Sequence, residues 1–211
     1  MTIKIEPRRR LPIATARAIA EAQSARQEIA ETYDGQLFPR LNDAGEAVSC
    51  RKKCSHCCYH PVYATILEGA TIYTWLVEQG RWDITLKRAL QDTKDRVRGL
   101  AVEVWMMSLI PCPLLKDDLC TAYEARPFAC RITYSIGDPA ECHPHRLGNS
   151  MLPRRELYEA LTIVEQRILK RHHLQHFRIP LAAAILWGER IVKGEVELED
   201  SQTALLDGMD V

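Results

Sequence analysis

The sequence has no excess of charge of either sign, because 28 lysines and arginines balance 28 aspartates and glutamates among 211 residues. Proteins that bind nucleic acid without sequence preference usually carry a large basic excess. The balance therefore argues against nucleic acid as a general partner, and it leaves open only local binding by a basic face.

Long apolar runs are also missing. The longest run, residues 181–187, is far shorter than the roughly 20 residues that a helix needs to cross a bilayer. Charged residues at Arg17, Glu21 and Arg26 interrupt the segment after the arginines at 8–10, so this segment lacks the apolar core of a signal peptide. We therefore expect a cytoplasmic protein without membrane contact, in a compartment that keeps thiols reduced.

Familiar nucleotide-binding and nucleophile motifs are absent as well. None of the 10 glycines forms a phosphate-cradling loop, and no serine occupies a nucleophile motif. A catalytic cysteine–histidine pair stays open, but it would use one thiol among 8 cysteines. A small-molecule substrate and a protein substrate are equally compatible with the sequence, as is any oligomeric state.

What the sequence does contain is 8 cysteines in two groups. The groups are Cys50, Cys54, Cys57 and Cys58, and then Cys112, Cys120, Cys130 and Cys142. Thiolates are soft ligands that suit zinc, copper(I) and iron–sulfur clusters, and they suit magnesium or calcium poorly. Because cysteines used only for packing are scattered singly, the grouping predicts metal ligation with all eight as candidate ligands.

The spacing within the groups supports ligation and leaves the kind of site open. Two residues between Cys54 and Cys57 allow a tight turn that aims both sulfurs at one centre. The adjacent side chains of Cys57 and Cys58 diverge, so we do not expect identical roles for them at one ion. Eight thiols exceed the four ligands of a tetrahedral zinc. Two iron–sulfur clusters, two zinc ions, one of each, a single site with spare thiols, or one structural zinc beside redox-active cysteines all fit this number.

Histidines near the cysteines are alternative ligands. They are His56, His60, His143 and His145. With eight thiols available, we expect these histidines to lie around the site or on the surface. Three more lie toward the C-terminal end of a predicted helix, where they favourably meet the helix dipole and need no further role. They are His172, His173 and His176.

Most of the remaining chain has helical periodicity. Helices are predicted over residues 12–33, 65–79, 83–110, 153–173 and 180–192. Asp83 is the expected cap of the longest helix, Gly80 ends the helix before it, and Pro111 ends the longest helix itself. The apolar stripe of this helix is Leu86, Leu90, Val97, Leu100, Val104 and Met107. Residues 37–49 are predicted to form a loop.

The predicted fold class is mainly α, with helices surrounding an irregular cysteine-rich metal-binding centre. Prolines at 113, 127, 139 and 144 keep the second cysteine group out of long helices. The expected organisation is an N-terminal helix and loop over 1–49, a cysteine-rich core over 50–145, and C-terminal helices with an acidic tail over 146–211. Together these parts are expected to form one compact domain.

The cysteine pattern resembles a known family. Cys50-x3-Cys54-x2-Cys57-Cys58 is followed by CPLLKDDLCTAYEARPFACR over residues 112–131 and then by Cys142. This pattern resembles the YkgJ-like CxxCxxCC family of zinc- or iron-chelating domains, to which flagellin lysine N-methylase is a larger, distant relative. The resemblance covers about residues 50–142. Two departures are a first gap of three residues instead of two, and Leu119 where glycine is frequent.

The resemblance implies site residues and a cofactor. Cysteines 54, 57, 58, 112, 120 and 130 would be the chelating positions, with Cys50 and Cys142 completing the set. Tyr123, Arg126 and Arg131 would surround the metal, where an arginine offsets the negative charge of a thiolate site. The alternative for Arg126 is pairing with Glu124 or with loop carbonyls.

We therefore expect an iron–sulfur protein with one or two clusters of the 4Fe–4S type. Such a protein would be an electron carrier, a redox sensor, or an enzyme acting in redox chemistry or in modification of an amine or amino-acid side chain. The alternative is a structural-zinc interaction module without catalysis, which would bind a partner through its helices or through the basic segments 8–10 and 51–53.

Overall fold

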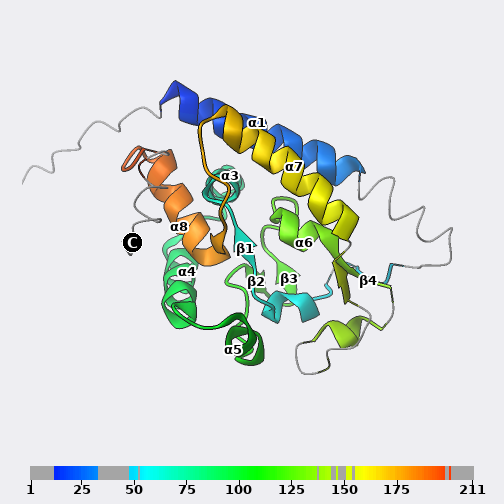
Figure 1. The fold of residues 1–211 in the computed structure, drawn as a ribbon. Helices are drawn as coiled ribbons and strands as arrows, with labels where there is room; N and C mark the ends of the chain where they lie inside the picture. Colours follow the sequence, from blue (N-terminus) through cyan, green and yellow to red (C-terminus); the bar gives the residue numbers. More distant parts are fainter. Residues whose placement is uncertain are drawn as a thin grey trace, which may run out of the picture.

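The fold is mainly helical, as the computed structural model shows (Figure 1). It describes residues 12–32, 48–51, 53–136, 138–143, 146, 151–153, 155–197 and 200. The α-helices are α1 (Ile13–Thr32), α3 (Ile66–Glu78), α4 (Ile84–Val97), α5 (Val102–Met107), α6 (Phe128–Ile132), α7 (Arg155–Arg171) and α8 (Leu181–Val192). The 3-10 helices are η2 (His56–Tyr59) and η3 (Pro139–Cys142). The predicted fold class is thereby confirmed, whereas most of the loop predicted over 37–49 lies outside the described residues.

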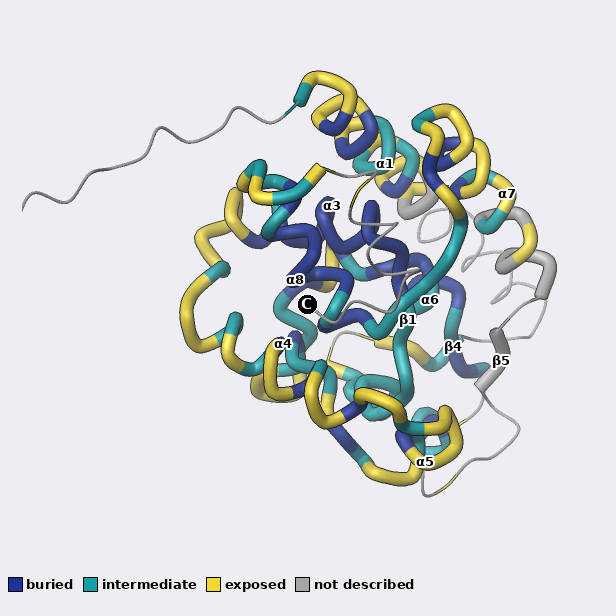
Figure 2. The backbone as a smooth tube through the Cα atoms, turned by 60° about the vertical axis from the view of Figure 1, so that its left-hand side comes forward, coloured by how far each residue is buried: buried dark blue, intermediate teal, exposed yellow. Residues whose placement is uncertain are grey.

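Helices α3 and α8 form the buried centre of the molecule, which Figure 2 shows in dark blue. Two glycines allow their backbones to approach closely. A Cβ atom at Gly69 would lie less than 3.0 Å from the carbonyl oxygen of Ala184, and one at Gly188 less than 3.0 Å from the amide nitrogen of Ala70. The crossing therefore depends on the absence of side chains at these two positions.

The ends of α3 follow from its sequence. Thr65 caps the N-terminus, where its side chain accepts a hydrogen bond from the Glu68 amide and the Glu68 carboxyl accepts one from the Thr65 amide. This reciprocal pair is a capping box. Gly80, with φ of 63°, takes the left-handed conformation after the last turn. The predicted helix over 65–79 and its glycine stop are both confirmed.

The single helix predicted over 83–110 is wrong, because the chain forms two helices there, α4 and α5. Asp83 caps α4 as predicted, with its carboxyl accepting from the Leu86 amide at 2.7 Å. The break lies at Gly99, whose φ of 69° is incompatible with a continuing right-handed helix. Consequently Val104 and Met107 are exposed rather than part of one apolar stripe.

Helices α1 and α7 lie side by side (Figure 1) and pack against the remainder through a cluster that includes Ile19, Leu169 and Trp187. Two histidines at the end of α7 have specific partners, contrary to the expectation that the helix dipole was their only role. The His172 Nε2 atom lies 2.9 Å from Glu21 Oε2 of α1. His176 contacts a buried carboxyl of α7.

Three short antiparallel strand pairs are present among the described residues. They are β1 (Tyr63–Ala64) with β6 (Ile179–Pro180), β2 (Leu115–Lys116) with β3 (Leu119–Cys120), and β4 (Thr133–Ser135) with β5 (Met151–Pro153). One of them, β2–β3, is a local hairpin. The β1–β6 pair places the start of α8 beside the first cysteine segment, since the Leu181 amide donates to the Val62 carbonyl at 2.9 Å. No helix in the described part of the chain is long and apolar enough to cross a membrane.

Candidate metal centre

One cavity of about 370 Å³ brings both cysteine groups together. Its lining includes Cys54, Cys57, Cys58, Cys112, Cys120 and Cys130. Cys54 precedes η2, and Cys57 and Cys58 lie within it. Cys112 lies three residues before β2, Cys120 ends β3 and Cys130 is in α6. Six of the predicted ligands are thus gathered around one hollow, although their assignment as ligands stays a prediction.

Backbone hydrogen bonds fix the first cysteine group against the second. The Cys112 amide donates to the Cys58 carbonyl at 2.7 Å, which ties the two groups together. Within the first group, the Cys58 amide donates to the Ser55 carbonyl at 2.9 Å and closes a tight turn over Ser55–Cys58, one residue after the turn expected over Cys54–Cys57. Lys53 precedes this turn with a φ of 73°.

The β2–β3 hairpin carries Cys120 to the cavity. Its turn residues Asp117 and Asp118 have φ values of 51° and 58°, a left-handed conformation that aspartate tolerates better than most residues. The Ser55 hydroxyl donates to Asp118 Oδ1 at 2.9 Å and so joins this hairpin to the first cysteine group. The sequence contained no signal for this contact, because serine and aspartate are common in turns for local reasons.

The thiols differ in their proton affinity. A hydrogen bond from the Cys58 thiol lowers the pKa of Cys57 to about 7, against the opposing effect of burial. The same bond, together with burial, raises the pKa of Cys58 well above its ordinary value. Burial also raises the pKa of Cys112 to about 12 and raises those of Cys120 and Cys130. Metal that binds these sulfurs must therefore displace protons, and Cys57 is the readiest thiolate.

The three residues predicted to surround the metal lie in two different places. Tyr123 and Arg126 line the cavity, and the Arg126 guanidinium carbon lies 3.9 Å from the Tyr123 ring centroid. The charge of Arg126 contributes to lowering the pKa of Cys57. Arg131 is instead buried with its guanidinium donating to the Glu124 carbonyl, and it lines a separate hollow beside α1. Adjacency to Cys130 in sequence thus does not place the Arg131 side chain at the thiols.

Cys50 and Cys142 lie together outside the lining of the cavity, beside Ser135 of β4. The Ser135 amide donates to Cys50 Sγ at 3.2 Å, and the Ser135 side chain is hydrogen-bonded to the Cys142 sulfur. His60 contacts the Cys142 carbonyl through Nε2 at 2.5 Å. Sequence reasoning missed Ser135, since nothing in the spacing relates it to either cysteine.

The remaining histidines lie near the cysteines without lining the cavity. The His143 ring packs against His56, with ring centroids 6.2 Å apart, and against Tyr59, with centroids 5.7 Å apart. His145 lies outside the described residues. The expectation that the histidines surround a metal site stays a prediction.

The donor set fits a thiophilic metal. All eight cysteines lie in the described part of the chain and all are free thiols. Among the described residues, no three side chains of histidine, cysteine, aspartate or glutamate are placed to hold a metal ion as they stand. The six thiols therefore border a hollow rather than meeting at one point.

A helical frame around six gathered thiols defines a cysteine-rich, metal-chelating class of protein. Residues 49–146 match the model of the CxxCxxCC family, which is described as a "Putative zinc- or iron-chelating domain". The match covers 98 of the 211 residues and confirms, over this segment, the resemblance seen in the sequence. Comparison with curated proteins gave no match, and neither did comparison with solved structures.

Proposed function

We propose that the cavity binds an iron–sulfur cluster in a cytoplasmic protein. The observation that carries this proposal is the gathering of six thiols around one hollow of about 370 Å³. A tetrahedral zinc uses four ligands that meet at one point, whereas clusters are larger groups held at their corners by cysteine thiolates. Four of the six thiols would suffice for one cluster, and the others would accept hydrogen bonds or bind a further metal.

The surrounding charge suits such a group. A thiolate-bound cluster is negatively charged and supplies one-electron chemistry when bound. Arg126, held over the Tyr123 ring at the cavity wall, would offset part of this charge and raise the reduction potential. This arrangement supports electron transfer or redox sensing, and the methylase relative suggests amine modification as an enzymatic use.

A structural zinc is the second candidate. It is favoured by two consecutive turns around Cys54 and Cys57, in which the Cys54 amide donates to the Arg51 carbonyl at 3.0 Å and the Cys58 amide donates to the Ser55 carbonyl at 2.9 Å. Turns of this kind present two thiolates to one zinc ion. In this case the metal would join the two cysteine groups, and the protein would act as an interaction module.

Purification without oxygen should give a brown protein if the first candidate is correct. The measurements are the visible absorption spectrum and the content of iron, acid-labile sulfide and zinc per chain. Sulfide in amounts matching iron, with a broad absorption that fades on oxidation, is the expected result. A colourless protein that contains zinc alone would overturn the cluster and support the second candidate. The same protein incubated with a chelator serves as the control.

A further inference from the structure

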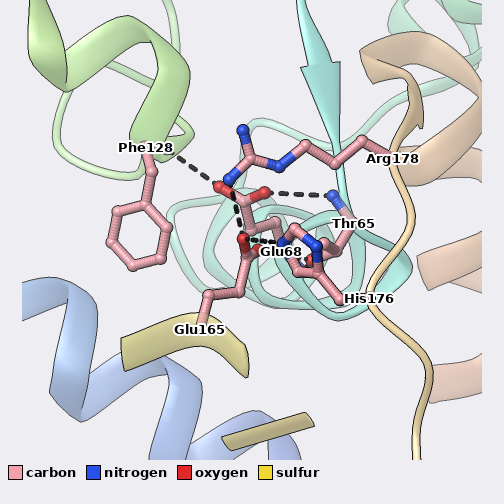
Figure 3. A network of polar contacts seen from close by, with 6 residues as sticks. All are labelled: Thr65, Glu68, Phe128, Glu165, His176 and Arg178. Carbon is pink, nitrogen blue, oxygen red and sulfur yellow. Dashed lines mark hydrogen bonds and ion pairs between the residues drawn. The ribbon is translucent and has the colours of Figure 1, made fainter. Parts of the chain in front are cut away.

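Two carboxyl groups are buried together near the start of α6 (Figure 3). Glu68 of α3 is 6% exposed and Glu165 of α7 is 3% exposed. Glu165 Oε1 accepts a hydrogen bond from the Thr65 hydroxyl at 2.9 Å. Its Oε2 atom accepts one from the Arg178 guanidinium at 2.8 Å and lies 3.0 Å from His176 Nε2. Glu165 is thus fixed from three directions.

Glu68 connects this group to α6. Its Oε2 atom accepts from the Thr65 amide at 3.0 Å, and its Oε1 atom accepts from the Phe128 amide at 2.8 Å. Phe128 is the first residue of α6, and the capping residue Pro127 makes no side-chain hydrogen bond to the helix. The first amides of a helix have no acceptor within the helix. The Glu68 carboxyl of α3 supplies the acceptor for the Phe128 amide. Cys130 follows two residues later.

The two carboxyl groups meet at Thr65, whose amide donates to Glu68 at 3.0 Å and whose hydroxyl donates to Glu165 at 2.9 Å. A hydrogen bond between these neighbouring carboxyls, which lowers the pKa of Glu165, requires a proton on one of them. Burial and the charge of Glu165 raise the pKa of Glu68 to about 8. Burial opposes ionisation of Glu165 too, but hydrogen bonds from His176, Arg178 and Glu68 outweigh it and lower its pKa to about 2. The other charged groups near the pair are Arg26 of α1 and, beside it, Arg131 of α6. At neutral pH the proton therefore belongs to Glu68.

We propose that Glu68 is a positioning residue, which shares one proton with Glu165 and holds the start of α6, and with it Cys130, at the thiol cavity. Each step rests on a contact. Glu165 is anchored by α7 and by the segment that leads to β6, Glu68 is anchored by Glu165 and Thr65, and the Phe128 amide is anchored by Glu68. Only the final step, from Cys130 to bound metal, rests on the proposed function.

The shared proton is tested by the pH dependence of unfolding in the full chain. Because the pKa of Glu68 is raised from 4.5 to about 8 by folding, its stabilising effect is complete below 4.5 and is lost as pH rises through 8. Between these values, unfolding of the wild type should release about one proton more than unfolding of Glu68→Gln, which has no proton to lose. The matched control is Glu189→Gln, another buried glutamate, which pairs with Lys87 and Lys193. If the free energy of unfolding depends on pH equally in the wild type and in Glu68→Gln, the shared proton is refuted.

The positioning role is tested by amide hydrogen exchange at Phe128 and by metal content. Glu68→Leu removes the acceptor, so the Phe128 amide should exchange about tenfold faster and metal content should fall. Glu68→Gln keeps one carbonyl oxygen for the Phe128 amide but loses the acceptor for the Thr65 amide, so exchange and metal content should change less than in Glu68→Leu. Glu189→Gln should leave both unchanged. Unchanged Phe128 exchange in Glu68→Leu would overturn the proposal even if metal is bound. Faster exchange in a protein that binds no metal would support it and contradict the proposed function instead. If Glu68→Leu does not fold, the proposal is tested by the pH dependence of the unfolding free energy of Glu68→Gln.

Discussion

Cys57→Ser should lower the affinity of the protein for its metal by more than about 100-fold. Loss of a residue that only supports a ligand already costs about 10- to 100-fold, and loss of the ligand itself should exceed that range. Cys57 is the thiol whose pKa is lowered, to about 7, and it lines the cavity with Cys58 and Arg126 beside it. A serine hydroxyl stays protonated at neutral pH and is a poor ligand for a thiophilic metal. Cys120→Ser, from the second group, should act in the same direction.

The test measures metal per chain and thermal unfolding for each variant. Both variants should also unfold at lower temperature than the wild type, because metal that binds only the folded state stabilises it. Cys50→Ser is the matched control, since Cys50 does not line the cavity and should retain the metal. Unchanged metal and unfolding in both Cys57→Ser and Cys120→Ser would refute their assignment as ligands. Loss at Cys50 equal to that at Cys57 would place Cys50 in the same site.

Gly188→Ala should destabilise the fold by about 3 kcal/mol or more, through steric overlap rather than through any effect on metal. The new Cβ atom would meet the backbone of Ala70 at less than 3.0 Å, and neither α3 nor α8 can yield without moving its buried face. Relief of the overlap requires the helices to separate, which opens the best-packed part of the core. Equilibrium unfolding in urea measures the change.

Gly80→Ala is the control for this prediction. Gly80 has open space around its Cβ position, and its φ of 63° is the only obstacle to a side chain. That conformation costs alanine about 1–2 kcal/mol. Gly188→Ala should therefore be clearly the less stable variant. Equal stability of the two would show that α3 and α8 are farther apart than described.

The sequence predicted those helices whose ends carry local signals. The segment after Thr65 has a capping residue, an apolar run and a glycine stop, and these agree with α3. The break at Gly99 was missed because a glycine within an apolar periodic pattern is often tolerated in a helix. Only the positive φ of Gly99, which the structure supplies, shows that the helix ends there. The two-residue strands were beyond prediction for another reason. Pairs such as Tyr63 with Pro180 depend on contacts between distant segments.

The composition of the metal centre was more predictable than its geometry. Thiol chemistry and spacing are local properties, so both cysteine groups could be recognised before their arrangement was known. The division between the cavity thiols and the pair at Ser135 depends on how β4 meets the chain at Cys50, and no spacing encodes that. The direction of Arg131 was mistaken because adjacent side chains in a helix, here those of Cys130 and Arg131, point in different directions. The expected division of the chain into three parts stays a prediction.

The hydrogen bond between the Cys112 amide and the Cys58 carbonyl has a kinetic consequence. Because the polypeptide itself joins the two halves of the centre, part of the ordering entropy is lost during folding and not at metal capture. Uptake should then be limited by proton release and small sulfur displacements, on a faster timescale than refolding of a cysteine-rich loop. The protein without metal would keep its folded scaffold, so it could bind metal again after each loss.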